Sequence, residues 1–233
     1  MENKITKTKL LKKETLTSDV YLLRTQKPEG FIYVAGQFAQ FLIPDPNNPN
    51  KLLKRSYSLC SIPSDDYLEF YIKVLPDGIG SDYIRYLKEG DTLDMCGPFG
   101  TFVLNIDDAP ICLIATGVGV APIIGVLRAA LNERGFKSNI HLLFGLRNER
   151  GIFLTEMLDE LKNKYSNFNY TLTLSRPSDE WNGKKGRVTA HFDEIIRDDC
   201  HYYICGNPDM VTDTRKLLEE KGVEKERTHF EMF

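Results

Sequence analysis

A run of nineteen residues without a charged side chain, APICLIATGVGVAPIIGVL (109–127), most constrains how this chain can fold. About 18 such residues are long enough for a membrane span, but the two prolines and three glycines argue against one continuous helix. A strand at 111–115, a turn TGVGVAP (116–122) and a helix beginning near Pro122 fit better, because proline suits the first helical turn. We expect the free N–H groups of this turn to bind an anion such as a pyrophosphate.

The second half of the chain repeats the same order of elements four times. Each apolar strand segment is followed by an amphipathic helix segment: 111–116 by 122–135, 140–145 by 153–165, 170–175 by 188–198, and 201–206 by 208–222. Continuous apolar strands separated by such helices are typical of a parallel sheet covered on both faces. We therefore predict an α/β, Rossmann-like domain over residues 106–233.

The first hundred residues consist of short strand segments separated by turn residues. The segments are 20–25, 36–44, 55–61 and 67–74, and one short helical pattern covers 81–90. Strands of this length with polar, Gly- and Pro-containing turns are typical of antiparallel sheets. We predict a small antiparallel β-barrel over residues 1–105.

Composition excludes several classes of protein. Charged residues make up 27% of the chain and the formal net charge is -3, which gives no electrostatic reason to expect nucleic acid or an anionic membrane as partner. The five cysteines lack the spacings of zinc or plant-type iron–sulfur sites, so we expect no metal. Their odd number and the absence of an apolar segment near the N-terminus favour a reducing, cytoplasmic location.

Several short motifs have ordinary explanations when each is taken alone. RSYSLCS (55–61) can be an alternating strand, Ser81 in GIGSDYI a helix N-cap, and TGVGVAP a tight strand-to-helix turn. Their order along the chain is more specific, with GPFGTF (97–102), CGNPDMV (205–211) and a final EMF. Over nearly its whole length the chain resembles the ferredoxin-NADP reductase superfamily.

The resemblance implies that the barrel binds FAD. Arg55 would bind the flavin diphosphate through its planar guanidinium, Tyr57 would stack on the isoalloxazine, and Ser58 would hydrogen-bond near flavin N5, where hydride arrives. Gly80 and Ser81 would present the first amides of a helix to the phosphates. The other positions implied on the flavin side are Ser56, Tyr71 and Lys73.

The resemblance also implies a pyridine-nucleotide site in the second domain. The nucleotide cradle would comprise Thr116, Gly117, Gly119 and Pro122. Cys205 and Gly206, followed by Asn207 and Pro208, would lie at a strand end facing the nicotinamide. Cys205 needs no nucleophilic role there, because the flavin accepts the hydride and the protein only aligns the rings.

The chain's last residues resemble the plant-type ending of this superfamily. The resemblance places the carboxylate of Glu231 near the flavin and the ring of Phe233 over the isoalloxazine until nicotinamide displaces it. We predict that Ser58, Cys205 and Glu231 are the catalytic residues, whose loss lowers turnover more than flavin content.

Basic residues that follow two strand segments of the second domain bear on the choice between NADPH and NADH. Ser175 and Arg176 match the Ser-Arg pair of NADP-dependent relatives, and Arg147, Lys184 and Arg187 could add charge for a 2'-phosphate. We predict NADPH as the electron donor, with NADH as an alternative.

The cysteine spacings show no fused iron–sulfur domain, so we expect the electrons to leave for a separate molecule. We predict ferredoxin or flavodoxin as the carrier, docking on a basic rim formed by Lys51, Lys54 and Lys73. The alternatives are an NAD(P)H:flavin reductase, a stand-alone reductase component of an oxygenase, and a catalytically silent flavin-binding redox sensor subunit. The sequence does not determine the oligomeric state.

Overall fold

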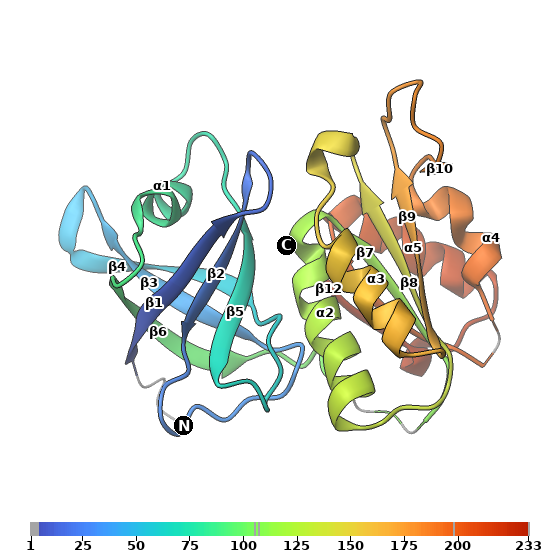
Figure 1. The fold of residues 1–233 in the computed structure, drawn as a ribbon, viewed down its shortest axis with the longest axis horizontal. Helices are drawn as coiled ribbons and strands as arrows, with labels where there is room; N and C mark the ends of the chain where they lie inside the picture. The colour runs from blue at the N-terminus through green and yellow to red at the C-terminus, as the bar shows by residue number, and fades with distance from the viewer. Residues whose placement is uncertain (1–4, 105, 107, 198, 233) are drawn as a thin grey trace. The chain divides into compact units, whose positions relative to one another are not determined.

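Each half of the chain is built on a six-stranded sheet (Figure 1). The computed structural model describes residues 5–104, 106, 108–197 and 199–232. Contacts divide the chain into two units, the first comprising Met1–Leu104 with Ile124–Ala129 and the second Asn105–Ile123 with Ala130–Phe233. The predicted fold class, an antiparallel barrel followed by a parallel α/β sheet, is confirmed.

The sheet of the first unit is antiparallel, with the strand order β4-β3-β6-β1-β2-β5. Its strands are β1 (Thr6–Thr15), β2 (Val20–Gln26), β3 (Phe38–Asp45), β4 (Asn48–Ser58), β5 (Tyr67–Lys73) and β6 (Thr92–Phe99). Just after β4, the Cys60 N–H donates to the Glu69 carbonyl oxygen of β5 at 2.9 Å. This bond connects the two outer strands of the order, so the sheet closes into a barrel.

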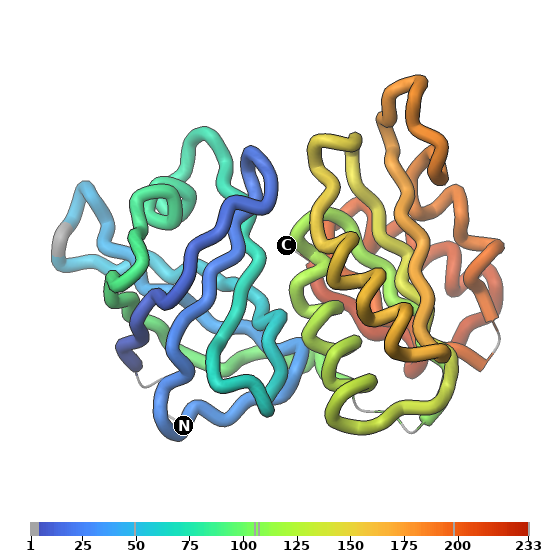
Figure 2. The backbone as a smooth tube through the Cα atoms, viewed as in Figure 1, coloured from blue at the N-terminus to red at the C-terminus, as the bar shows by residue number. Residues whose placement is uncertain are grey.

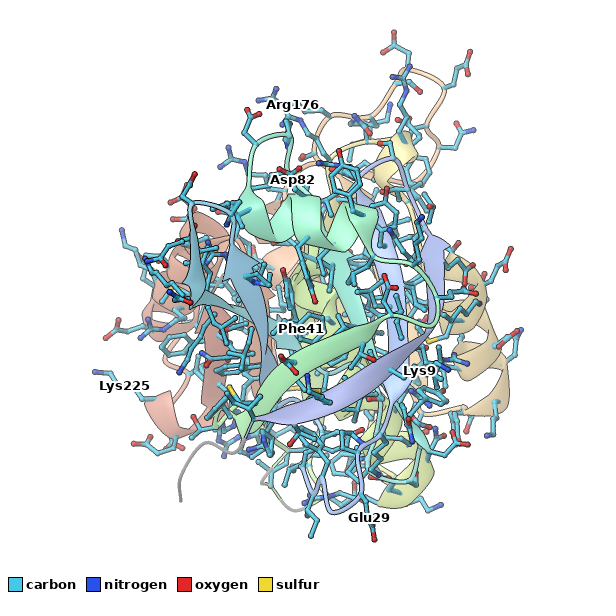
Figure 3. The ribbon with its side chains drawn as sticks, turned by 90° about the vertical axis from the view of Figure 1, so that its left-hand side faces the viewer. Lys9, Glu29, Phe41, Asp82, Arg176 and Lys225 are labelled. Carbon is cyan, nitrogen blue, oxygen red and sulfur yellow. The ribbon has the colours of Figure 1, made fainter. Side chains whose placement is uncertain are left out.

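The barrel is filled by the alternate side chains that point inward from its strands. Leu10, Leu23, Phe41 and Phe70 belong to one cluster of buried residues, and Phe41 packs edge-on against Phe70 with ring centroids 5.0 Å apart. Helix α1 (Ile79–Tyr86) adds Ile84 to this cluster. Figure 3 shows α1, which carries the labelled Asp82, lying across one end of the barrel above the strand of Phe41.

The sheet of the second unit is parallel, with the strand order β10-β9-β8-β7-β11-β12. Its strands are β7 (Ile111–Thr116), β8 (Ile140–Leu146), β9 (Phe168–Leu174), β10 (Lys184–Lys185), β11 (His201–Gly206) and β12 (Thr228–Met232). Helices α2 (Val120–Arg128) and α3 (Thr155–Lys164) cover one face, and α4 (Phe192–Ile195) and α5 (Pro208–Glu220) cover the other (Figure 1). Because the strands are parallel, their carboxyl ends meet at one edge of the sheet, where ligands of such sheets bind.

The uncharged run has the predicted strand-turn-helix structure, with a 3₁₀ turn η1 (Gly117–Gly119) between β7 and α2. A π-helical turn, η2 (Ala129–Glu133), continues α2. In the described part of the chain, no helix has the length and apolar character needed to cross a membrane.

One predicted helix is wrong. The pattern over 188–198 forms only a 3₁₀ turn, η4 (Val188–His191), followed by the single turn of α4, and residue 198 lies outside the described residues. His191 lies where the two turns join, with its ring 3.0 Å from the Lys185 carbonyl oxygen and 3.2 Å from Glu194. Short 3₁₀ turns also occur at η3 (Glu149–Gly151) and η5 (Lys225–Arg227).

Candidate functional site

The end of β4 places four of the predicted flavin-side residues, 55–58, in succession at the barrel wall. Arg55 and Ser56 are exposed, Tyr57 is half-buried and Ser58 is buried. The Tyr57 ring packs against Phe41 with centroids 4.9 Å apart, which holds it against the core. Burial raises the pKa of Tyr57 to about 12, although the charge of Arg55 opposes this shift. The phenol therefore stays neutral at physiological pH.

The Ser58 hydroxyl is the most informative atom of this strand. It is buried and has no hydrogen-bond partner among the described residues. A buried hydroxyl without a partner costs about 1–3 kcal/mol. Such a group is available to a partner from outside the chain, either a ligand or a water molecule.

Arg55 lies against the first turn of α1. A Cβ atom on Gly80 would come within 3.1 Å of Arg55 Cγ and 3.4 Å of Arg55 Nε, so the absence of a side chain lets the arginine pass close to the helix. The Arg55 guanidinium donates to the Lys54 carbonyl oxygen at 2.9 Å and has no acidic partner among the described residues. An unpaired guanidinium beside a helix N-terminus is an arrangement that can bind phosphate.

Ser81 does not cap α1. The N-cap is Gly78, with no side-chain cap, and Ser81 lies within the first turn. Its hydroxyl accepts a hydrogen bond from the Leu75 N–H at 2.9 Å and thereby fixes the loop that precedes the helix. The hydroxyl hydrogen can still be donated to a ligand.

The two β5 residues predicted for the flavin side have partners within the barrel. Tyr71 is buried, and its pKa is raised well above the usual value by burial and by the neighbouring Cys60 and Glu69. Lys73 is exposed and pairs with Asp19 at 3.1 Å. The Lys73 ammonium is therefore less available to a ligand than Arg55.

In the second unit, the turn after β7 packs against the turn after β11. A Cβ atom on Gly119 would lie 2.4 Å from Gly206 Cα, and Gly117 has a positive φ of 56°. The Asn207 N–H donates to Thr116 Oγ1 at 3.2 Å and joins the two turns. This contact brings together the residues predicted for the nucleotide cradle, with Pro122 in the first turn of α2.

Cys205 and Glu231 are neighbours on adjacent parallel strands, because β11 pairs with β12 in the register Cys205 to Glu231. The thiol is fully buried, and burial together with Glu231 raises its pKa. Burial raises the pKa of Glu231 to about 7, and its Oε2 atom is buried without a partner among the described residues. Phe233 lies outside the described residues.

The residues predicted for NADPH lie at the carboxyl edge of the sheet. The Arg176 N–H donates to the Arg147 carbonyl oxygen at 2.7 Å, so the segments after β8 and β9 run side by side. Ser175 and both arginines are exposed, and neither guanidinium has an acidic partner among the described residues. Figure 2 shows the segment from β9 to β10 as a long loop that extends from this edge.

The other residues suggested for positive charge differ in how they are paired. Lys184 is held by both carboxylate oxygens of Glu194 at 2.8 Å, whereas Arg187 has no acidic partner in the described ranges. Lys51 lies 3.8 Å from Asp45, and Lys54 is exposed without an acidic partner among the described residues.

Gly125 is a residue of structural importance that the motifs did not identify. It lies in α2, and a Cβ atom there would come within 2.8 Å of the Leu59 carbonyl oxygen. Leu59 is the residue that directly follows Ser58 in the chain. Nearby, Arg128 pairs with Asp65 at 2.9 Å. A glycine within an apolar helical pattern was the available signal, because such a residue is commonly kept for close packing.

Two family models match this chain, one in each half. Residues 7–104 match the family model described as oxidoreductase FAD-binding domain, and residues 113–216 match the oxidoreductase NAD-binding domain. The chain is 33% identical over 216 residues to ferredoxin–NADP reductase B of Sorangium cellulosum, which covers 88% of this chain and 87% of the relative.

Two further similarities extend the comparison. The anthranilate 1,2-dioxygenase electron transfer component of Acinetobacter baylyi is 29% identical over 211 residues, which cover 89% of this chain and 60% of that protein. The crystal structure of a ferredoxin NADP+ reductase from Neisseria gonorrhoeae with bound FAD and NADP has a TM-score of 0.88 at 22% identity, covering 99% of each chain. This structural similarity supports the fold.

Proposed function

Since the chain belongs to the ferredoxin-NADP reductase superfamily, we propose that it oxidises NADPH with bound FAD and passes single electrons to a separate protein carrier, ferredoxin or flavodoxin. That it is a flavin-dependent electron-transfer oxidoreductase follows from its two matched domains and its relatives. The choice of NADPH, the carrier and the role of each site residue are the proposed part.

The buried, unpartnered Ser58 hydroxyl is the observation that carries this proposal. FAD fits the residues around it, since Arg55 and the first turn of α1 offer a cation and free amides for a diphosphate. When bound, FAD supplies the exchange between a two-electron hydride donor and one-electron carriers. Tyr57 would then orient the ring system through its packed side chain, and Ser58 would donate its hydroxyl hydrogen.

The second unit would hold the pyridine nucleotide at the turns after β7 and β11. The backbone from Thr116 to Gly119 offers N–H groups for the pyrophosphate, and the absence of a side chain at Gly206 lets Thr116 pack directly against it. Cys205 would place a small, uncharged side chain beside the nicotinamide, because its raised pKa keeps the thiol protonated. Glu231 would hold a proton at a carboxylate that titrates near neutral pH.

NADPH is preferred to NADH in this proposal because of the charges beside Ser175. Arg147 and Arg176 come together through a backbone hydrogen bond and are free of acidic partners among the described residues. A 2'-phosphate would gain charge-assisted hydrogen bonds from such guanidinium groups, whereas NADH lacks that phosphate.

The basic rim predicted to bind an acidic protein carrier has fewer unpaired lysines in the structure than the sequence suggested. Lys73 is paired with Asp19, and Lys51 approaches Asp45. Lys54, exposed on the strand that carries Arg55, has no acidic partner among the described residues and is the best remaining candidate for the rim. Local charge of this kind mainly raises the association rate.

A reductase component of an oxygenase is the second candidate, favoured by the similarity to the dioxygenase electron transfer component. An NAD(P)H:flavin reductase would differ by releasing its flavin, and a redox sensor would bind flavin without turnover. We keep the cytoplasm as the proposed location, on the strength of the odd number of cysteines.

An anaerobic visible spectrum of the dialysed protein, recorded before and after one equivalent of NADPH or NADH, tests the proposal. We expect a retained flavin band that NADPH bleaches faster than NADH. A colourless protein that oxidises NAD(P)H only with added FAD would replace the proposal with the flavin reductase, and a bound flavin that neither nucleotide reduces would replace it with the sensor.

A further inference from the structure

Two buried thiols lie against each other at the amino-terminal edge of the parallel sheet. Cys112 is the second residue of β7, and Cys200 directly precedes β11. Their Sγ atoms are 3.4 Å apart, and each residue is 3% exposed. Among the described residues, this is the one contact between two of the five free cysteines.

The strand order and one tyrosine fix this pair. Strands β7 and β11 are parallel neighbours, with Cys112 opposite Tyr202. The Tyr202 hydroxyl accepts from the Arg197 N–H at 2.8 Å and donates to the Arg197 carbonyl oxygen at 2.9 Å. These two bonds tie Arg197 to Tyr202, and the Cys200 N–H donates to the same Arg197 carbonyl oxygen at 3.3 Å, so hydrogen bonds position the residue that carries the second thiol.

A pocket of about 370 Å³ is lined by residues that include Cys112 and Cys200. His141, Asn167 and Arg197 are among the polar residues that line it beside the two cysteines. A pocket of this volume has room for small polar molecules such as water or hydrogen peroxide. Because both cysteines are 3% exposed and belong to the lining of this pocket, we expect small reagents, and not proteins, to reach them.

The two sulfur atoms have different environments. The Cys112 sulfur lies 3.1 Å from the Ile195 carbonyl oxygen and 3.4 Å from the Cys200 sulfur, and its single hydrogen can be donated to either of them. Donated to Cys200, it stabilises the Cys200 thiolate, which lowers the pKa of Cys200 and, together with burial, raises that of Cys112. A thiolate attacks oxidants and a thiol does not, so Cys200 is the better nucleophile and Cys112 the better resolving group.

We propose that Cys112 and Cys200 form a redox-active dithiol that hydrogen peroxide oxidises to an intramolecular disulfide. The Cys200 thiolate attacks one peroxide oxygen, the O–O bond breaks, and the other oxygen leaves as water after taking up a proton. The Cys112 sulfur then attacks the resulting sulfenic sulfur and expels a second water. The two sulfurs together lose two electrons, which the peroxide gains.

Formation of the disulfide requires the two sulfurs to come closer. A disulfide has an S–S distance of about 2.05 Å, so the sulfurs must approach each other by about 1.3 Å from their separation of 3.4 Å. Because Cys112 is already in contact, the sulfenic acid would be captured before further oxidation. This proposal rests on the second unit alone and does not depend on which carrier receives the electrons.

Thiol counting on the intact, flavin-loaded protein tests the proposal. The protein is reduced with dithiothreitol, desalted, treated with hydrogen peroxide, unfolded and labelled with N-ethylmaleimide for mass spectrometry. We expect the label count to fall from five to three, with one linked peptide pair containing residues 112 and 200 that dithiothreitol separates. Five labels after treatment, a different linked pair, or a sulfinic acid at Cys200 without a link would overturn it.

Single replacements provide the controls. After peroxide, Cys200→Ala should keep all four remaining labels, and Cys112→Ala should lose one label, with a sulfenic or sulfinic acid at Cys200 and no linked peptide pair, whereas Cys96→Ala, in the barrel, should fall from four to two. A loss of two labels in Cys200→Ala would overturn the proposal. If a core variant does not fold, the peptide map of the unmodified protein still decides.

Discussion

Glu231 stands opposite Cys205 on the parallel ladder between β11 and β12, with one carboxylate oxygen buried and without a partner among the described residues. Burial raises the pKa of this carboxyl from 4.5 to about 7. In the folded protein it is therefore largely protonated at pH values where the unfolded chain has already released the proton. This difference makes stability depend on pH.

Replacing Glu231 with Gln should remove that dependence. Between about pH 4.5 and about pH 7 the unfolded chain binds fewer protons than the folded protein, so the free energy of unfolding contributed by Glu231 falls as the pH rises. Urea unfolding from about pH 5 to about pH 8 should show the difference between wild type and variant declining through this range. Turnover of the variant should fall about tenfold or more at unchanged flavin content.

An exposed carboxylate provides the control for this experiment. Glu226→Gln, in the turn before β12, should change neither turnover nor the pH dependence of stability. A Glu231→Gln variant whose stability follows the wild type in parallel at every pH would contradict the role of burial at this carboxyl.

Ser58→Ala should separate stability from function. Removing an unpartnered buried hydroxyl relieves a cost of about 1–3 kcal/mol, so the flavin-free variant should be at least as stable as the wild type in urea. Turnover should nevertheless fall, because the hydroxyl proposed to donate to the flavin is lost. The measurements are urea midpoints of the flavin-free proteins and NADPH oxidation by the loaded ones.

Ser61 is the matched control for Ser58. Its buried hydroxyl accepts from the Tyr33 hydroxyl at 3.0 Å and from the Glu69 N–H at 3.1 Å. Ser61→Ala should therefore destabilise the barrel by about 1–3 kcal/mol. Equal destabilisation by both replacements would mean that Ser58 has a partner within the folded chain.

Local sequence patterns predicted the strands that are buried along their whole length. They failed for strands that form only by pairing with segments far away in the sequence. Strands β7, β8 and β11 are buried on both faces and read as apolar runs. Strand β1 was missed because only Thr8 and Leu10 are buried among its exposed lysines. Strand β12 was missed because its five residues form a strand only through pairing with β11.

The candidate site shows the same division. The motifs identified Arg55, Ser58 and Gly119 by residue type and order. The unpartnered state of the Ser58 hydroxyl depends on side chains from several strands, and the position of Glu231 beside Cys205 depends on strand order. Neither property has a local signal, because both are set by tertiary packing.

Gly119→Ala should disrupt the junction of the two turns that is proposed to hold the nucleotide. The added Cβ would lie 2.4 Å from Gly206 Cα and 2.6 Å from the Cys205 carbonyl oxygen, so backbone must shift. We expect a loss of about 2–4 kcal/mol of stability and a raised KM for NADPH. Gly151→Ala, where nothing lies within 4 Å, should stay within about 0.5 kcal/mol of wild type, and similar losses in both variants would contradict the close packing.

Arg176→Ala should change the nucleotide preference. Its exposed guanidinium has no acidic partner among the described residues and lies on the segment joined to Arg147 by a backbone hydrogen bond. Losing charge-assisted bonds to a 2'-phosphate should lower kcat/KM for NADPH about 10- to 100-fold and leave kcat/KM for NADH nearly unchanged. Steady-state kinetics with both nucleotides measures the ratio of kcat/KM for NADPH to kcat/KM for NADH.

Arg150→Ala is the control, because Arg150 is an exposed arginine that also follows β8, and this replacement should leave the ratio as in wild type. An equal loss of kcat/KM with both nucleotides in Arg176→Ala would show that Arg176 does not bind the 2'-phosphate.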